Sequence, residues 1–331
     1  MILGLENNEL GRKMKVLKQT NHNIIEKDND FNELRTARDC MRWASSQFYQ
    51  YDLVFAHGVD NAFDEAIYLI LGALALPPDT PESWWDCRLT QTEKNRILSL
   101  LIQRIEKRKP TAYLLKEGWF AGLRFFIDER VLVPRSPIAE LIETQFSPWI
   151  EAKKVGYILD LCTGSGCIGI ASAYAFPDAE VDLLDVSNSA LDVAKINIEQ
   201  HGLKKRVHPI LSDLFSALKT QCYDIIVSNP PYVDASDMNV LSKEHQHEPA
   251  LGLQAGEDGL DLVRVILKEA GQYLSPQGIL IVEVGNSEKA VAQTWSKVPF
   301  FWLEFERGGQ GVFLLTKQDL DVYFKETFVD N

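Results

Sequence analysis

From residue 155 onward, short apolar runs alternate with segments of helical spacing, and this alternation constrains the fold more than any other feature. The runs that predict strands are residues 157–161, 180–185, 207–211, 223–228, 279–284, 301–306 and 312–316. Helical segments separate most of them, which favours a parallel, doubly wound α/β sheet. The last two runs are separated only by the turn Arg-Gly-Gly-Gln-Gly at 307–311. The sequence therefore predicts a Rossmann-like sheet with a terminal antiparallel strand.

The first 115 residues have a different pattern. Residues 1–29 are poor in apolar side chains, and we expect a flexible extension there. Apolar spacing predicts helices over residues 31–51 and 62–76, and a capping box of Thr90 with Glu93 predicts a third helix ending before Pro110. Residues 30–115 are thus expected to form a helical domain. Alternation over residues 119–133 predicts a β-hairpin, within a linker of residues 116–136 that leads into an α/β domain of residues 137–331.

Charge and cysteine content narrow the class of protein. The net charge of −13 disfavours a general nucleic-acid binder held by phosphate contacts, and it suits a basic protein partner. Five cysteines without a CxxC pair indicate reduced thiols and a cytoplasmic protein. No signal peptide is expected, and the longest apolar stretch, residues 66–76, is too short to span a bilayer.

A glycine loop follows the first predicted strand of the sheet. Gly164-x-Gly166-x-x-Gly169 matches a dinucleotide fingerprint, in which glycines let the backbone approach a ligand and a helix N-terminus receives an anion. Asp160, at the end of the strand, would repel a pyrophosphate but suits the sulfonium and amino group of S-adenosylmethionine. The loop therefore favours S-adenosylmethionine, with a nicotinamide dehydrogenase as the alternative.

Two further acidic residues stand at successive strand ends. Asp185 closes the second strand about 20 residues after the glycines, where an acid can bind ribose hydroxyls. Asp213 follows the third strand and could accept a hydrogen bond from an adenine amino group. Alternatively, Asp185 caps a helix and Asp213 starts a turn.

The fourth predicted strand ends in Ser228-Asn229-Pro230-Pro231-Tyr232. The prolines keep this turn out of a helix and direct its carbonyl groups outward. The Asn229 side-chain oxygen and the Pro230 carbonyl can then hold both hydrogens of a planar amine or amide, while Tyr232 walls in the group. Such a site catalyses by orientation and electrostatics. The motif alone does not choose among glutamine, adenine and cytosine, although the net charge argues against a base-flipping DNA enzyme. A non-catalytic ribosome-assembly binder is a third reading, which the intact motifs disfavour.

From residue 30 to the C-terminus, the chain resembles the protein-glutamine N-methyltransferases that modify translation factors and ribosomal proteins. Four segments besides the glycine loop carry the likeness to the ribosomal-protein branch: residues 60–66, 131–138 (Val-Leu-Val-Pro-Arg-Ser-Pro-Ile), 247–252 and 308–313. The release-factor branch usually reads Pro-Arg-Pro followed by Glu or Asp and Thr. The resemblance implies a class I methyltransferase sheet, a helical substrate-recognition domain, and methylation at the N5 amide of a glutamine in large-subunit ribosomal protein L-three. A release-factor substrate is the alternative.

The resemblance also implies particular contacts. It assigns the cofactor to Cys162, Thr163, Gly164, Ser165, Gly166, Asp185, Asp213, Leu214 and Asn229, and the target amide to Asn229, Pro230, Pro231 and Tyr232. Cys162 departs from the glycine of related enzymes, and its side chain restricts the backbone there. Residues 254–260 are expected at the rim of the site. The reaction needs no metal, so His245 and His247 are interpreted as part of a solvated loop.

Overall fold

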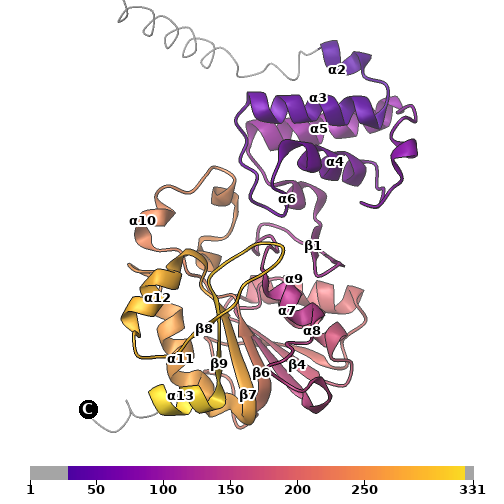
Figure 1. The fold of residues 1–331 in the computed structure, drawn as a ribbon. Coiled ribbons are helices and arrows are strands. Elements are labelled where there is room, and N and C mark those ends of the chain that lie inside the picture. Colours follow the sequence, from indigo (N-terminus) through magenta and orange to yellow (C-terminus); the bar gives the residue numbers. More distant parts are fainter. Residues whose placement is uncertain (1–28, 325–331) are drawn as a thin grey trace, which may run out of the picture. The chain divides into compact units, whose positions relative to one another are not determined.

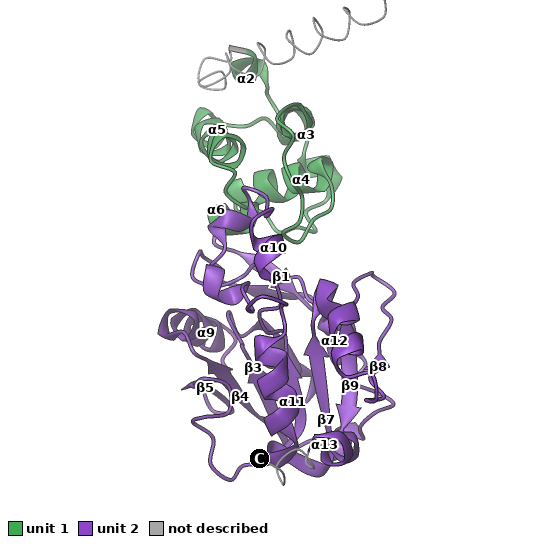
Figure 2. Cartoon of the chain, turned by 90° about the vertical axis from the view of Figure 1, so that its left-hand side faces the viewer, with its two compact units in different colours: residues 1–115 green, residues 116–331 purple. Residues whose placement is uncertain are grey.

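The structure, a computed structural model, describes residues 29–324. The chain divides into two compact units, residues 1–115 and 116–331, which are coloured separately in Figure 2. The extension predicted over residues 1–29 lies outside the described residues, except that Asn29 begins the first described helix. No helix within residues 29–324 is long and apolar enough to cross a membrane.

The first unit is built from helices. These are α2 (Asn29–Glu33), α3 (Ala37–Gln50), α4 (Ala62–Ala73), α5 (Gln91–Glu106) and α6 (Thr111–Leu115), with a 3-10 turn η2 (Glu82–Trp84). The helix predicted over residues 31–51 is in fact two, because Thr36 and Asp39 form a capping box that starts α3 afresh. The capping box predicted for Thr90 and Glu93 is present at the start of α5.

A buried ion pair and a hydrogen bond to the same carboxylate join three helices of this unit. Arg104 on α5 places Nε 2.5 Å from Oε1 of Glu65 on α4. The same carboxylate oxygen accepts a hydrogen bond of 2.7 Å from the hydroxyl of Thr111 on α6. Both charged side chains are buried, so removing either partner would leave an uncompensated charge in the core, at a cost of about 3–5 kcal/mol.

The second unit contains a seven-stranded sheet (Figure 1). Its strands are β3 (Tyr157–Leu161), β4 (Glu180–Asp185), β5 (Val207–Leu211), β6 (Tyr223–Ser228), β7 (Leu274–Glu283), β8 (Phe301–Trp302) and β9 (Val312–Thr316). They lie in the order β5-β4-β3-β6-β7-β9-β8. The first five are parallel, and β9 is antiparallel to both β7 and β8. The predicted Rossmann-like sheet with a terminal antiparallel strand is confirmed, with the last strand inserted between β7 and β8.

Helices cover both faces of this sheet. They are α7 (Ile138–Glu143), α8 (Cys167–Ala175), α9 (Asn188–Gln200), α10 (Ala235–Met238), α11 (Asp261–Tyr273), α12 (Glu288–Thr294) and α13 (Lys317–Tyr323), with 3-10 turns η3 (Ala152–Lys154), η4 (His245–His247), η5 (Ala250–Gly252) and η6 (Gly285–Ser287). Helix α8 packs on β3 and β4, α9 on β4 and β5, and α11 and α13 on β7. Side chains of a strand alternate between the faces. Leu159 and Leu161 therefore join the core that includes α11, while Asp160 faces Gly169 of α8.

The predicted hairpin is shorter than expected. It consists of β1 (Gly118–Phe120) and β2 (Leu123–Phe125), and residues 126–133 form no strand. The side-chain amide of Asn197 on α9 pairs with the backbone of Phe126, accepting from its N–H (2.7 Å) and donating to its carbonyl (3.1 Å). The N–H of Val133 donates to Oε1 of Glu248 (3.1 Å). Polar side chains thus satisfy backbone groups that a strand partner would otherwise have satisfied.

Candidate active site

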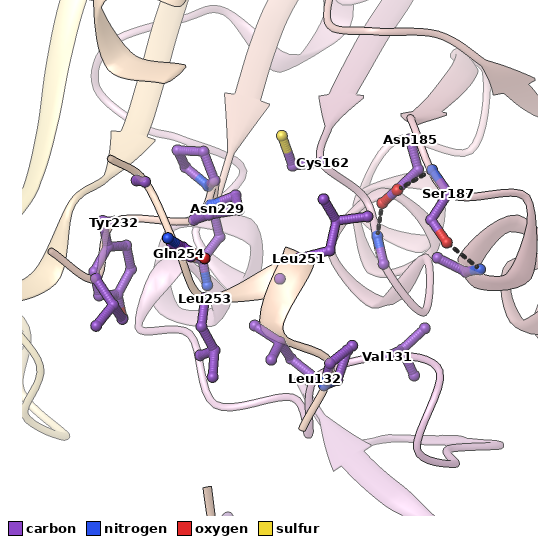
Figure 3. Close-up of a pocket in the computed structure, with 18 of the residues that line it drawn as sticks. Val131, Leu132, Cys162, Asp185, Ser187, Asn229, Tyr232, Leu251, Leu253 and Gln254 are labelled. Atoms are coloured by element: carbon purple, nitrogen blue, oxygen red, sulfur yellow. Dashed lines mark hydrogen bonds between the residues drawn. The ribbon is translucent and has the colours of Figure 1, made fainter. Parts of the chain in front are cut away.

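A cavity of about 1240 Å³ opens at the carboxyl ends of the parallel strands. All of its lining residues belong to the second unit: the glycine loop, the ends of β4 and β6, and residues 129–136 and 249–256 contribute. Figure 3 shows Asn229, Tyr232 and Gln254 on one side of it and Asp185 and Ser187 on the other. This is the position where open α/β sheets bind their ligands.

The glycine loop joins β3 to α8 through left-handed backbone. Gly164 and Gly166 have φ values of 54° and 81°, which glycine adopts without strain. Cys162, Thr163, Gly164 and Ser165 line the cavity. Gly166 does not; it is the N-cap residue of α8, and a Cβ there would lie 3.1 Å from Leu183 and 3.3 Å from Ala194.

Asp160 lies behind this loop and does not line the cavity. It is fully buried, and its Oδ2 accepts hydrogen bonds from the hydroxyl of Thr163 (2.6 Å) and the N–H of Gly169 (2.9 Å). Burial raises its pKa to about 7, although these two hydrogen bonds oppose the shift. The sequence placed Asp160 in contact with the cofactor. In the structure it instead ties the loop to α8.

Cys162 occupies the position where the sequence departs from related enzymes. Its φ is 58°, a conformation that glycine adopts freely and that costs a residue with a Cβ roughly 1 kcal/mol or more. Burial raises the pKa of the thiol, so it stays protonated and uncharged at neutral pH. The side chain therefore enters the cavity as a small, neutral group.

Asp185 links the loop to the helix that follows β4. Oδ2 accepts a hydrogen bond from the N–H of Gly164, and Oδ1 accepts one from the N–H of Ser187, both 2.9 Å long. The hydroxyl of Ser187 caps α9, so the alternative that Asp185 itself is the cap does not hold. Burial raises the Asp185 pKa. Each oxygen keeps lone pairs for a further donor in the cavity.

Asp213 and Leu214 follow β5 and line the cavity beyond Asp185. Leu214 has a φ of 45° and its carbonyl accepts from the hydroxyl of Ser212, which fixes the turn. Leu214 is buried while Asp213 is exposed, so the carboxylate is available to a ligand.

The Asn229-Pro230-Pro231-Tyr232 turn enters the same cavity from β6, and all four residues line it. The strand end is fixed by Ser228, whose hydroxyl donates to the carbonyl of Leu161 on neighbouring β3 (2.9 Å). Leu161 and Ser228 are also partners in the strand register. The glycine loop and the asparagine turn therefore start from adjacent, hydrogen-bonded positions.

Tyr232 lies in a socket formed by Gly259, Glu283, Gly285 and Ser287. The sequence did not predict these contacts. The carbonyl of Tyr232 accepts from the hydroxyl of Ser287 (2.9 Å), and its own hydroxyl lies 3.5 Å from Oε1 of Glu283. A Cβ on Gly285 would approach Cε2 of the ring to 2.6 Å, and one on Gly259 would approach the carbonyl oxygen to 2.5 Å. A sequence feature that could have indicated these contacts is that the long apolar run of β7 ends in a carboxylate, that of Glu283.

Arg135 and Glu248 join residues 131–136 to the segment that precedes residues 249–256. The guanidinium makes two hydrogen bonds to the carboxylate, of 2.5 and 2.8 Å. Glu248 is buried, and so is Glu244, so the segment around His245 and His247 is not the solvated loop that the sequence predicted. Of the predicted rim, Gln254, Ala255 and Gly256 line the cavity.

Known proteins are similar to this chain over nearly its whole length. The family model of the methyltransferase small domain matches residues 145–245. The ribosomal protein uL3 glutamine methyltransferase of Francisella tularensis is 49% identical over 298 residues, covering 90% of this chain and 95% of that protein. The protein of the same name from Neisseria gonorrhoeae is 47% identical over 289 residues, with coverages of 87% and 96%. The chain belongs to the uL3 glutamine methyltransferase family. The resemblance predicted from the sequence is thereby confirmed, and the protein is a methyltransferase.

Solved structures show a more distant likeness. A T. thermophilus 16S rRNA methyltransferase in complex with AdoMet and guanosine covers 60% of this chain, is 18% identical and has a TM-score of 0.42, with 49% of its own chain covered. A methyltransferase from Pyrococcus furiosus covers 58%, is 19% identical and has a TM-score of 0.41, with 89% of its own chain covered. At these values neither likeness carries a functional argument.

Proposed function

We propose that this protein transfers the methyl group of S-adenosylmethionine to the side-chain amide nitrogen of a glutamine in ribosomal protein uL3. The observation that carries this proposal is the hydrogen bond from Ser228 to Leu161. It aligns a glycine loop suited to the cofactor with an asparagine turn suited to a carboxamide, at one end of one cavity.

The residues around the cavity fit S-adenosylmethionine. The carboxylate of Asp185 has spare lone pairs for ribose hydroxyls, and exposed Asp213 can accept from an adenine amino group. Thr163, Gly164 and Ser165 supply backbone at the opening of α8, whose N-terminus favours the cofactor carboxylate. When bound, the cofactor supplies an electrophilic methyl carbon on a sulfonium.

The asparagine turn orients the nucleophile. The side-chain oxygen of Asn229 and the carbonyl of Pro230 each accept one N–H of the target carboxamide, which directs the nitrogen toward the methyl donor. Tyr232, held in its socket, forms the aromatic wall beside the amide, and Pro231 keeps the turn rigid. Transfer breaks the carbon–sulfur bond and forms a carbon–nitrogen bond, and the nitrogen then releases one proton to solvent. Orientation and electrostatics supply the rate enhancement.

Charge and domain organisation indicate the partner. The net charge of −13 suits a basic ribosomal protein and disfavours general nucleic-acid binding. The helical unit, residues 30–115, would recognise the substrate, and residues 116–136 would link it to the catalytic domain. We place the reaction in the cytoplasm, away from membranes and without a metal.

Mass spectrometry tests this function. Purified uL3 and a release factor are each incubated with enzyme and labelled S-adenosylmethionine, and their glutamine-containing peptides are analysed. Label on a uL3 glutamine, absent with the Asn229→Ala variant, is expected. Label on the release factor alone would move the protein to that branch. Calorimetric preference for NADH over S-adenosylmethionine would refute the cofactor assignment.

A further inference from the structure

Glu283 ends β7 at the cavity, and the mechanism above does not use it. Its side chain is almost fully buried. Oε2 accepts a hydrogen bond of 2.5 Å from the hydroxyl of Ser136, and Oε1 lies 3.5 Å from the hydroxyl of Tyr232. One carboxylate therefore connects the segment after the hairpin to the tyrosine of the asparagine turn.

The tyrosine has little freedom on its other sides. Ser287 holds its carbonyl, and Gly285 lies so close behind the ring that a Cβ would overlap it. The position of the phenol hydroxyl thus depends on the Glu283 carboxylate.

We propose that Glu283 is a positioning residue for methyl transfer, which holds the ring of Tyr232 against the target amide by accepting hydrogen bonds from Tyr232 and Ser136. The proposal rests on the function proposed above, because that function makes Tyr232 the wall of the amide pocket. It assigns to Glu283 no contact with the cofactor.

The ionisation state of Glu283 decides whether it can do this. Burial raises its pKa to about 7, while Ser136, Arg135 and Tyr232 oppose the shift. The charged and titratable groups around it are Arg135, which pairs with Glu248, and Tyr232, whose own pKa is raised by burial and by Glu283. The Glu283 carboxylate accepts hydrogen bonds from the hydroxyls of Ser136 and Tyr232. The protonated acid carries an O–H of its own and must act as the donor in one of these two hydrogen bonds. The arrangement therefore forms above pH 7 and is lost as the pH falls through 7.

A pH profile of kcat at saturating S-adenosylmethionine, with uL3 as substrate, tests the proposal. Wild type should lose activity as the pH falls through about 7. Glu283→Gln should lower kcat about tenfold at high pH and remove this limb, since an amide does not titrate. Asp160 acts on the cofactor only indirectly, through the glycine loop that it ties to α8, so saturating S-adenosylmethionine limits the influence of its titration on this profile. Exposed Glu304→Gln is the matched control and should keep the wild-type profile.

The second readout requires no activity. With tyrosine labelled at 13Cζ, the Tyr232 resonance, assigned with Tyr232→Phe, should titrate near pH 7 in wild type and not in Glu283→Gln. The two substitutions should also be non-additive in kcat, because each breaks the same contact. A Glu283→Gln enzyme with the wild-type limb, or a Tyr232 signal that titrates unchanged in it, overturns the inference. If wild type transfers no methyl to uL3 while the resonance behaves as expected, the proposed function fails and the contact stands.

Discussion

Replacing Asp160 with asparagine should change how stability depends on pH. The substitution keeps an oxygen that can accept from Thr163 and Gly169, but it puts an NH2 where Oδ1 now stands. No described residue donates to that oxygen, and it is fully buried. The new NH2 is a buried donor at a position where the described residues form no hydrogen bond, and leaving it unpaired would cost about 1–3 kcal/mol at every pH.

The pH-dependent part of the Asp160 contribution to the free energy of unfolding follows from its raised pKa. The pKa moves from 3.8 to about 7 because burial disfavours the carboxylate. The folded protein therefore binds this proton more tightly than the unfolded chain. The protonated group favours folding below pH 4, and the contribution is lost as the pH rises through 7. At 1.36 kcal/mol for each tenfold change, the loss is on the order of 1.5 kcal/mol at pH 5 and 4 kcal/mol at pH 8.

Urea denaturation at these two pH values measures the effect. Between pH 5 and pH 8, wild type should lose roughly 2.5 kcal/mol more unfolding free energy than Asp160→Asn does. Comparing the two proteins cancels other titrating groups such as Glu283. Asp178→Asn, the same change at an exposed position, should follow wild type. Parallel pH dependences for wild type and Asp160→Asn would show that Asp160 is not held protonated by burial.

Three other substitutions test separate parts of the site. Asn229→Ala should lower kcat on the order of 10²–10³-fold while calorimetry finds cofactor affinity nearly unchanged; equal turnover would contradict its role. Asp185→Asn should weaken S-adenosylmethionine binding about tenfold, because its amide NH2 must face the N–H of Gly164 or Ser187; an unaltered Kd would contradict this. Gly285→Ala should lower both kcat and Tm, since the position has φ 45° and the methyl meets Tyr232; an unchanged Tm would argue against the close packing.

Local patterns predicted much of the fold. The strands of the sheet were recognisable because buried parallel strands are short apolar runs, and Thr90 with Glu93 marked the start of α5. The glycine loop and the asparagine turn were found because each is contiguous in sequence. Both reach one cavity, since the ends of adjacent parallel strands meet at the same edge of the sheet.

Contacts between residues far apart in the sequence could not be predicted from local sequence patterns. Glu283 and Tyr232 are 51 residues apart, and Ser136 and Glu283 are 147 apart, so no periodicity connects them. The hairpin was overestimated because alternation over residues 119–133 resembles strand pairing, whereas Asn197 and Glu248 provide the partners. Asp160 was assigned to the cofactor because its position at a strand end was known but the direction of its side chain was not.

The insertion of β9 between β7 and β8 has a consequence for the order in which the site matures. Glu283 pairs with Val312, and the N–H of Val284 donates to the carbonyl of Gly311. Until residues 311–316 have been synthesised, β7 has no neighbour on that side, and the stretch from Glu283 to Ser287 lacks its support. The half of the cavity contributed by β3, β4 and β5, to which we assign the cofactor, can assemble earlier during translation. A nascent chain would thus complete the half of the cavity that contains the glycine loop before it can hold Tyr232 in place.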